Sequence, residues 1–447
     1  MRFGARRVYA LGIVAATLGA VCLGGAIIGP AAITTGCTTH QCDSLSTDFY
    51  GGRMTDPNTY ETSDLNEDWV YYPGEVTVRV HFPPGNTRVP VSIDSYVGTG
   101  LSPNGGPDFQ GGDSWVPAAG QLAEFFFLDQ TGFSVTNGSC ATYYSRFVAH
   151  FPPEGITLFG GLGPTGDAGI TTLNDTWTWD GVQWTGQGSA PAAGPEARER
   201  ATLVRAANAI FLFGGFDDAA PQPYLLDTWT WDGAAWAPMY FASPYPTPRA
   251  DAAAAVVDGT LVLFGGEGPG PTDLGDTWTW DGVLSDTWSN PAPSGATPSP
   301  RSGASAAALG GSVVLFGGRS DGTPLGDTWV WDGSGWSQRM VTGPSPRFHA
   351  SIASLGPTVL LFGGDSGSGD LADTWLWDGT TWTQQNVAGP SARSEATAAA
   401  LHGTVVLFGG SQGTNMLDDT WTWSAGGWMQ QFAGGPTARA AAAATGP

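Results

Sequence analysis

The sequence predicts an all-β fold in which six copies of one four-stranded unit close into a ring, preceded by a small antiparallel β-domain. The first observation is that the tripeptide Phe-Gly-Gly occurs six times and is followed each time by Asp-Thr-Trp. The second is that most of the 20 tryptophans fall in these recurring segments. The third is that the chain ends on a copy of the unit's first strand, which the first unit lacks.

The composition limits the possible partners. All 17 basic residues are arginine, and 40 acidic residues bring the net charge to −23. Such a charge repels phosphate backbones, so we do not expect nucleic acid as a partner. The five histidines are scattered, which argues against a metal site built from several histidines. The sequence contains no P-loop or His-Glu-x-x-His motif, and we expect no cofactor.

Residues 1–36 are predicted to form an export signal or a membrane anchor. Three arginines within the first seven residues precede an apolar run, residues 8–33, that contains no charged side chain. A basic start and an apolar run are typical of export signals, and this run is also long enough to span a bilayer. Gly36-Cys37 resembles the lipobox of bacterial lipoproteins, which makes Cys37 a candidate for lipidation. We therefore expect an exported protein, held in the cell envelope or secreted; cleavage, lipidation and retention all stay open.

Residues 37–152 are predicted to form the small antiparallel β-domain. Strand candidates lie at 76–82, 121–128 and 143–151, and turns rich in glycine and proline separate them. In an oxidising compartment we expect Cys42 and Cys140 to form a disulfide, with Cys37 as the alternative partner if it carries no lipid. Nothing in this segment indicates what the domain does.

Residues 153–447 contain the six repeated units. Phe-Gly-Gly begins at Phe159, Phe213, Phe264, Phe316, Phe362 and Phe408. An arginine stands 15 residues before each of the last five phenylalanines, and a sixth stands near the chain's end: Arg198, Arg249, Arg301, Arg347, Arg393 and Arg439. Each unit therefore reads as a small alanine-rich inner strand, an aliphatic strand that ends at the glycines, a strand of Asp-Thr-Trp-x-Trp, and a fourth strand that begins at the next tryptophan.

The third and fourth strands are predicted to form a hairpin. In the first unit the turn signal is Asp180-Gly181, and a two-residue loop there would place Trp179 opposite Val182. Trp177 would then lie opposite Trp184, and the alternation of a strand puts all three tryptophans on one face. One small sheet cannot bury such a face, so it must pack against the neighbouring unit.

These residues resemble the kelch repeat, with its paired glycines, its aromatic residue after Asp in the third strand and its later tryptophan. The resemblance covers residues 153–447 and implies a six-bladed kelch-type β-propeller of an exported bacterial type, with one blade per repeat. The third unit inserts Leu284-Ser285-Asp286 and the sixth replaces Asp-Gly by Ser424-Ala425, so we expect irregular hairpins there. The alanine-rich strand that begins after Arg439 is predicted to close the first blade.

The binding surface is predicted on the face where the loops between strands two and three and the connections between blades emerge. These loops differ in length, and the longest are Leu162–Asn174, Phe216–Leu226 and Glu267–Gly275. The ligand-binding candidates are Asp217, Asp218, Tyr224, Glu267 and, as a ring around the axis, the six arginines. The recurring carboxylates, Asp175 and its equivalents, favour instead a structural role for these arginines.

Two functions are compatible with this interpretation. The first is a non-catalytic, exported scaffold that recognises a protein or a glycan through the variable loop face. The alternative is a carbohydrate-active enzyme, a sugar isomerase, lyase or hydrolase, that uses the mouth of the propeller. We predict no catalytic residue or metal site and expect a monomer that meets the membrane only through its N-terminal segment. The pattern does not identify the ligand.

Overall fold

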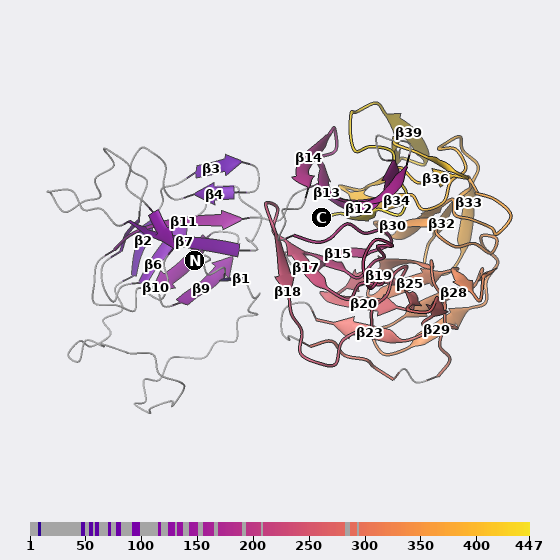
Figure 1. Ribbon diagram of the computed structural model, residues 1–447, viewed down its shortest axis with the longest axis horizontal. Coiled ribbons are helices and arrows are strands. Elements are labelled where there is room, and N and C mark those ends of the chain that lie inside the picture. Colours follow the sequence, from indigo (N-terminus) through magenta and orange to yellow (C-terminus); the bar gives the residue numbers. More distant parts are fainter. Residues whose placement is uncertain are drawn as a thin grey trace. The chain divides into compact units, whose positions relative to one another are not determined.

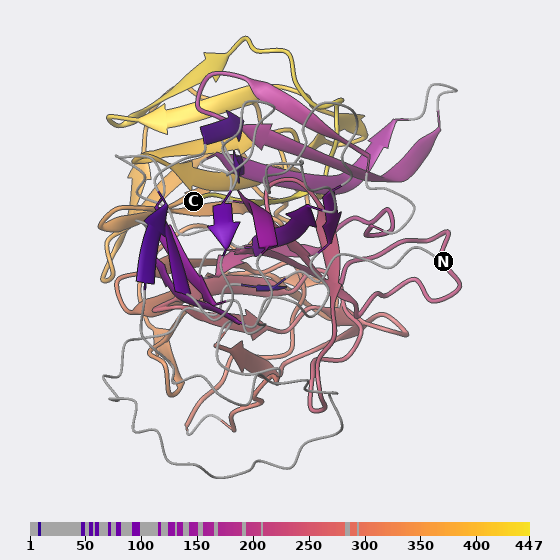
Figure 2. The same ribbon diagram turned by 90° about the vertical axis from the view of Figure 1, so that its left-hand side faces the viewer.

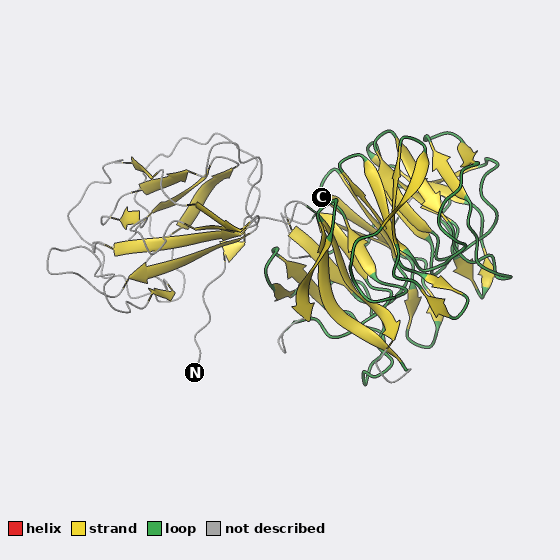
Figure 3. Ribbon diagram, turned by 90° about the horizontal axis from the view of Figure 1, so that it is seen from above, coloured by secondary structure: helices red, strands yellow, loops and turns green. Residues whose placement is uncertain are grey.

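The computed structural model describes residues 155–447, apart from 165–168, 190–193, 207–208, 282–286 and 293–294, together with eleven short strands among residues 1–152. Every element in these ranges is a strand, and none is a helix (Figure 3). The described residues accordingly contain no helix long and apolar enough to cross a membrane. The chain divides into two compact units, residues 1–152 and 153–447.

The first unit contains two sheets. The larger follows the order β1-β7-β11-β4-β3, with β5 paired to β11 and β8 paired to β7, and the smaller follows β2-β6-β10-β9. The strands are β1 (Val8–Tyr9), β2 (Ser46–Phe49), β3 (Arg53–Asp56), β4 (Thr59–Glu61), β5 (Val70–Tyr72), β6 (Thr77–His81), β7 (Ser92–Gly98), β8 (Trp115–Pro117), β9 (Glu124–Asp129), β10 (Gly132–Thr136) and β11 (Tyr143–His150).

The three strands expected in this unit are present as β6, β9 and β11. The expectation of a wholly antiparallel domain is wrong in one place, because β2 runs parallel to β6. Tyr60 in β4 is fully buried, and its hydroxyl donates to the carbonyl of His81 at 3.3 Å, which links the two sheets. Cys37, Cys42 and Cys140 lie outside the described residues, as does the predicted export segment apart from β1.

The second unit is a six-bladed β-propeller (Figure 1). Blade one contains β40 (Ala443–Thr445), β12 (Ile156–Pro164), β13 (Ile170–Trp179) and β14 (Trp184–Ser189). Blade two contains β15 (Thr202–Ala206), β16 (Ala209–Phe213), β17 (Thr228–Trp231) and β18 (Trp236–Met239), and blade three contains β19 (Ala253–Val257), β20 (Thr260–Phe264) and β23 (Thr277–Trp280).

The remaining blades are regular. Blade four contains β24 (Ser305–Leu309), β25 (Ser312–Phe316), β28 (Thr328–Trp331) and β29 (Trp336–Arg339). Blade five contains β30 (Ser351–Leu355), β31 (Thr358–Phe362), β32 (Thr374–Trp377) and β33 (Trp382–Gln385). Blade six contains β34 (Thr397–Leu401), β35 (Thr404–Phe408), β38 (Thr420–Ser424) and β39 (Gly427–Gln431). Short ribbons in three loops pair β21 (Glu267–Gly268) with β22 (Thr272–Asp273), β26 (Arg319–Ser320) with β27 (Thr323–Pro324), and β36 (Ser411–Gln412) with β37 (Asn415–Met416).

The propeller closes through the end of the chain. β40 pairs antiparallel with β12, with Ala444 opposite Leu158, so the last residues supply the inner strand of blade one. Figures 1 and 2 both show the yellow strands of blade six beside the magenta strands of blade one. The predicted closure is therefore confirmed, and it leaves blade one without an unpaired inner edge.

The predicted register of the outer hairpin is wrong. Trp179 lies opposite Trp184, and Trp177 lies opposite Gly186, because the loop contains four residues rather than two. The Asp180 carboxylate accepts the backbone N–H groups of Val182 and Gln183 at 2.7 and 2.8 Å, which stabilises the longer loop. Of the two irregular units, the third has no fourth strand among its described residues, whereas the sixth keeps the four-residue spacing between Trp423 and Trp428.

Aromatic contacts between blades form the core. In five interfaces the fourth-strand tryptophan meets the phenylalanine of Phe-Gly-Gly in the preceding blade edge to face, with ring centroids 5.1–5.4 Å apart. Trp184 of blade one packs in this way on Phe408 of blade six, so the same contact also closes the ring. The prediction that the tryptophan face packs against the neighbouring unit is correct. The paired glycines permit close approach, since a Cβ on Gly160 would lie 2.6 Å from the carbonyl oxygen of Arg198 in blade two.

Candidate functional site

The six recurring arginines are buried inside the blades. Each is 1–2% exposed and forms a bidentate pair with the aspartate of Asp-Thr-Trp in its own blade. The pairs are Arg198–Asp227, Arg249–Asp276, Arg301–Asp327, Arg347–Asp373, Arg393–Asp419 and Arg439–Asp175. In Arg347 all five N–H donors are used: two on Asp373, two on Ser345 and one on the carbonyl of Gly363. Side chains engaged in this way hold the blade together.

The aspartates of these pairs are ionised. Burial by itself would raise the pKa of each carboxyl, but the hydrogen bonds and the charge of the paired arginine outweigh it and lower the pKa. Each carboxylate also accepts the indole N–H of the tryptophan two residues later, as Asp327 does from Trp329 at 2.7 Å. The structural interpretation of the arginines and aspartates thus accounts for every contact they make.

A second ring lies two residues after the arginines, at the mouth of the central cavity. Its members are Arg200, Asp251, Gly303, His349, Glu395 and Ala441, one from each blade, and all six have left-handed backbone with φ between 52° and 62°. Each backbone N–H donates to the carbonyl of the preceding member at 2.8–3.1 Å, so six hydrogen bonds run around the axis without a break. We call these six residues the axial ring.

The position of the axial ring follows from the topology. Each member stands where the connection between two blades ends and the inner strand begins. The ring therefore lies on the face that carries these connections and the loops between strands two and three. The cavity beneath it has a volume of about 220 Å³ and is lined by the inner strands, including Thr202, Ser305 and Ser351. This is the face on which the sequence placed the binding surface.

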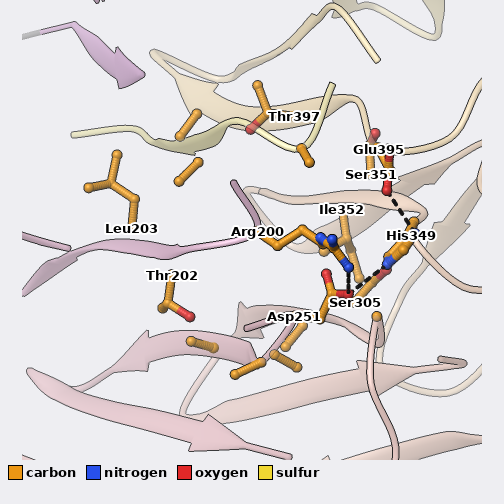
Figure 4. Close-up of a pocket in the computed structure, with 18 of the residues that line it drawn as sticks. Arg200, Thr202, Leu203, Asp251, Ser305, His349, Ser351, Ile352, Glu395 and Thr397 are labelled. Carbon is orange, nitrogen blue, oxygen red and sulfur yellow. Dashed lines mark hydrogen bonds and ion pairs between the residues drawn. The ribbon is translucent and has the colours of Figure 1, made fainter. Parts of the chain in front are cut away.

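Four charged or titratable side chains of the axial ring form one cluster (Figure 4). His349 lies between two carboxylates, with Nε2 3.1 Å from Asp251 and Nδ1 3.4 Å from Glu395. Arg200 reaches Asp251 from the other side at 3.5 Å. The Asp251 side chain is 6% exposed, whereas Glu395 is 25% exposed and Arg200 is 22% exposed. Asp251 is thus the buried centre, and Glu395 and Arg200 are the groups that a ligand can reach.

The cluster shifts the ionisation of its members. Burial by itself would lower the pKa of His349, but the charge and hydrogen bond of Asp251 outweigh it and raise the pKa. Burial by itself would raise the pKa of Asp251, but the nearby His349 and Arg200 outweigh this effect and lower the pKa to about 2. Asp251 therefore remains a carboxylate at neutral pH and favours the protonated imidazole beside it.

Of the predicted loop residues, Tyr224 and Glu267 lie beside this cluster. Tyr224 donates its hydroxyl to Glu267, and Arg319, which the sequence analysis did not select, pairs with the same carboxylate at 3.0 Å. Burial and the bond to Glu267 raise the pKa of Tyr224 to about 12, so its hydroxyl stays protonated. Asp217 is 8% exposed and accepts from Thr172 of blade one at 3.0 Å. Asp218, the next residue along, is exposed at the tip of the loop.

Cation–π and aromatic contacts connect these residues into an arc across blades two to five. Arg200 lies over the ring of Phe216 at 5.3 Å, and Phe216 meets Tyr224 edge to face at 5.1 Å. Arg319 lies over Phe348 of blade five at 5.3 Å. The structure therefore brings Tyr224 and Glu267 together with Arg319 and the axial ring, while the six buried arginines stay apart from this surface.

Polar contacts also join neighbouring loops on this face. Asp273 accepts the backbone N–H of Asp321 at 2.9 Å, and Asp370 accepts that of Gly413 at 2.8 Å. Such bonds fix loops of different length relative to one another, so the face is shaped before a ligand arrives. Among the residues that the structure describes, no group of three or more His, Cys, Asp or Glu side chains is arranged to hold a metal ion.

Comparisons with known proteins agree with this architecture. The family model for the KLHDC2/KLHL20/DRC7 Kelch-repeats domain matches residues 224–339, which reach from blade two to the end of blade four. The F-box/kelch-repeat protein At1g51550 of Arabidopsis thaliana is 32% identical over 204 residues, which cover 41% of this chain and 41% of that protein. The chain therefore spans about two-fifths of the length of this relative. The six closed blades show that residues 153–447 form a β-propeller, and the two matches show that it contains kelch repeats.

Proposed function

We propose that this protein is a non-catalytic, exported scaffold that binds a protein ligand through the axial ring and the loops around it. One observation carries the proposal. The residues that build the blades recur in all six repeats, whereas the six positions of the axial ring hold six different residue types. A position that faces a shared mouth and differs in every blade serves recognition better than it serves folding.

The chemistry of the mouth supports a polypeptide ligand. It presents the carboxylate of Glu395, which is 25% exposed, and the guanidinium of Arg200, which is 22% exposed and pairs with Glu199 as well as with the buried Asp251. A peptide backbone with mixed side chains can pair with both charges and with the serine and threonine hydroxyls that line the cavity. The contacts between loops reduce the entropy lost on binding, because the surface is already ordered.

A pull-down with the full chain tests the binding surface. We expect the variant Asp218→Ala/Glu395→Gln to enrich its main partner from cell-envelope extracts at least tenfold less than the wild type, since it removes one accessible charge from the mouth and one from a loop on the same face. Val182→Ser is the control, because Val182 is 77% exposed in a hairpin on the opposite face. Equal enrichment by both variants contradicts the proposed surface. Turnover of a saccharide by the purified chain would favour the carbohydrate-active alternative instead.

Export is part of the proposal and depends on residues 1–36. Their basic start and apolar run are the properties that export machineries recognise. We expect the full chain to be recovered from the envelope or the medium when producing cells are fractionated. A variant lacking residues 1–36 should remain in the cytoplasm. Recovery of the full chain from the cytoplasm alone contradicts export.

A further inference from the structure

His349 of the axial ring lies between two carboxylates that belong to different blades. Its Nε2 is 3.1 Å from Asp251 of blade three, and its Nδ1 is 3.4 Å from Glu395 of blade six (Figure 4). A protonated imidazole carries an N–H on both nitrogens, whereas a neutral imidazole carries only one. His349 can therefore present a donor to both carboxylates only while it is protonated.

When His349 loses its proton, Asp251 is the partner that it keeps. The Asp251 side chain is 6% exposed, and a buried carboxylate that loses a donor is costly. Its oxygen is also the nearer of the two and lies within hydrogen-bond distance of Nε2. The remaining N–H therefore stays on Nε2, and the lone pair of Nδ1 then faces the carboxylate of Glu395, which repels it.

Glu395 is the side chain that can relieve this repulsion. A Cβ on Gly303 of blade four would lie 2.6 Å from Cδ2 and 2.8 Å from Nε2 of His349, so the imidazole packs directly on the backbone of that glycine. Phe348 meets the imidazole edge to face, with the ring centroids 5.0 Å apart. Glu395, in contrast, is 25% exposed, and among the described residues its only ion pair is the one with His349. Its carboxylate is therefore free to turn towards solvent.

The charges around the mouth favour a basic group as the new partner of this carboxylate. Arg200 already pairs with Glu199 and Asp251, and Arg319 pairs with Glu267, so neither guanidinium is available to replace the imidazole. The charged and titratable groups that face His349 from the other blades are Glu199, Arg200 and Tyr224 of blade two, Asp251 and Glu267 of blade three, Arg319 of blade four and Glu395 of blade six. Once His349 is neutral, the carboxyl groups of this set outnumber its cations, and a positive group of a ligand restores the balance.

We propose that His349 is a proton switch of the axial ring: its protonated form holds Glu395, and its neutral form releases this carboxylate to bind a basic side chain of the partner. The binding step rests on the polypeptide ligand of the proposed function, whereas the switch itself needs no ligand. Burial would lower the pKa of His349, but Asp251 and Glu395 outweigh it and raise the pKa above the ordinary 6.5. The release therefore takes place above pH 6.5, and the affinity for a basic ligand rises with pH.

Carbon-13 NMR of the full chain tests the switch without a ligand. Histidine labelled at Cε1 and glutamate labelled at the carboxyl carbon are followed from pH 5.5 to 10, and His349→Asn and Glu395→Gln assign the two signals. We expect the carboxyl signal of Glu395 to shift with the same midpoint as His349, far above the pH at which a carboxyl itself titrates. A constant Glu395 signal, or a His349 that keeps its proton up to pH 10, overturns the switch.

His402→Asn is the matched control for His349→Asn. His402 also has left-handed backbone, with φ 48°, but it is exposed in the turn between β34 and β35 on the opposite face. Asparagine tolerates this backbone, so both variants preserve the local conformation. His349→Asn should abolish the shift of Glu395, and His402→Asn should leave it unchanged. An equal effect of the two variants contradicts a switch at His349.

A pair of peptides tests the released carboxylate. The probes are acetyl-Gly-Arg-Gly-amide and the same peptide with citrulline, which has the shape of arginine without its charge. We expect the arginine peptide to bind at least fivefold more tightly one pH unit above the midpoint of His349 than one unit below it, as measured by the shift of the labelled signals. His349→Asn should remove this pH dependence, and Glu395→Gln should bind both peptides equally weakly.

The outcomes separate the switch from the proposed function. Equal affinities for the two peptides, no binding of either peptide, or tighter binding below the midpoint overturns the assignment of a basic ligand to Glu395. Coupled titration of His349 and Glu395 together with a pull-down that ignores Asp218→Ala/Glu395→Gln contradicts the proposed function and leaves the switch in place.

Discussion

At the scale of single residues, the Asp-Thr-Trp motif is explained by four hydrogen bonds. The aspartate accepts from the buried arginine of its own blade and from the tryptophan two residues later. The threonine accepts from the last tryptophan of the next blade, as Thr277 does from Trp336. Polar groups buried between sheets are costly unless they are paired, and each residue of this motif pairs one of them.

Removing a threonine hydroxyl should therefore destabilise the protein only where the hydroxyl is used. We expect Thr277→Val to lower the free energy of unfolding by about 1–3 kcal/mol, because it leaves the buried N–H of Trp336 without an acceptor. Thr228→Val makes the same chemical change at the interface where Trp288 forms no such bond. This variant should lower the free energy of unfolding by less than about 0.5 kcal/mol.

Denaturant unfolding of the two variants beside the wild type measures the difference. Both threonines are at least nine-tenths buried at equivalent places, so burial is matched between the two variants. Equal losses in the two variants would show that packing of the side chain, rather than its hydrogen bond, stabilises the interface.

At the scale of strands and hairpins, the sequence predicts which face a side chain occupies better than which residue lies opposite it. Trp177, Trp179 and Trp184 share one face in the predicted register and in the observed one, because the two registers differ by two residues and the strand period is two. The loop length depends on the Asp180 carboxylate and on Gly181, which alone in that turn has positive φ. A two-residue turn of the common hairpin type needs positive φ at both positions, and Asp180 does not supply it.

The candidate site could be predicted only in part, for a related reason. Repetition in the sequence reveals residues that every blade uses, so it selects the buried arginines and aspartates, which build the fold. The axial ring varies from blade to blade, and no pattern of residue types marks it. Its constant offset of two residues from each arginine is a signal that would have found it. Arg319 was missed because its pairing with Glu267 depends on how two loops of different blades meet.

At the scale of the whole molecule, contacts of several kinds hold the first and last parts of the propeller together. β40 adds a strand to blade one, Arg439 pairs with Asp175 across 264 residues of sequence, and Trp184 packs on Phe408. Only the first two depend on the residues after Gly435. A propeller without them would leave the inner edge of β12 unpaired and Asp175 without its cation.

Truncation after Gly435 should therefore lower the melting temperature by about 10 °C, since the loss of one partner from a buried ion pair costs roughly 3–5 kcal/mol. Differential scanning calorimetry measures the change. Deletion of Pro447 alone is the control, because it keeps β40, Arg439 and the Gly446 carbonyl, which accepts from Arg205 at 2.9 Å, in place. An unchanged melt after the longer truncation would show that the closure contributes little to stability.

The unbroken circle of peptide hydrogen bonds beneath the mouth has a consequence for how such a protein diversifies. The bonds use only backbone atoms, so they hold the six side chains in place whatever those side chains are. The backbone therefore keeps the same geometry at the mouth, whichever charged or polar side chains the six positions carry. Asn, Asp and Gly adopt a left-handed backbone at the lowest energetic cost. Substitutions at the six positions of the axial ring would therefore change the binding specificity without changing the backbone. In a repeat of this kind, the residues that can vary during evolution are different from the residues that the fold requires.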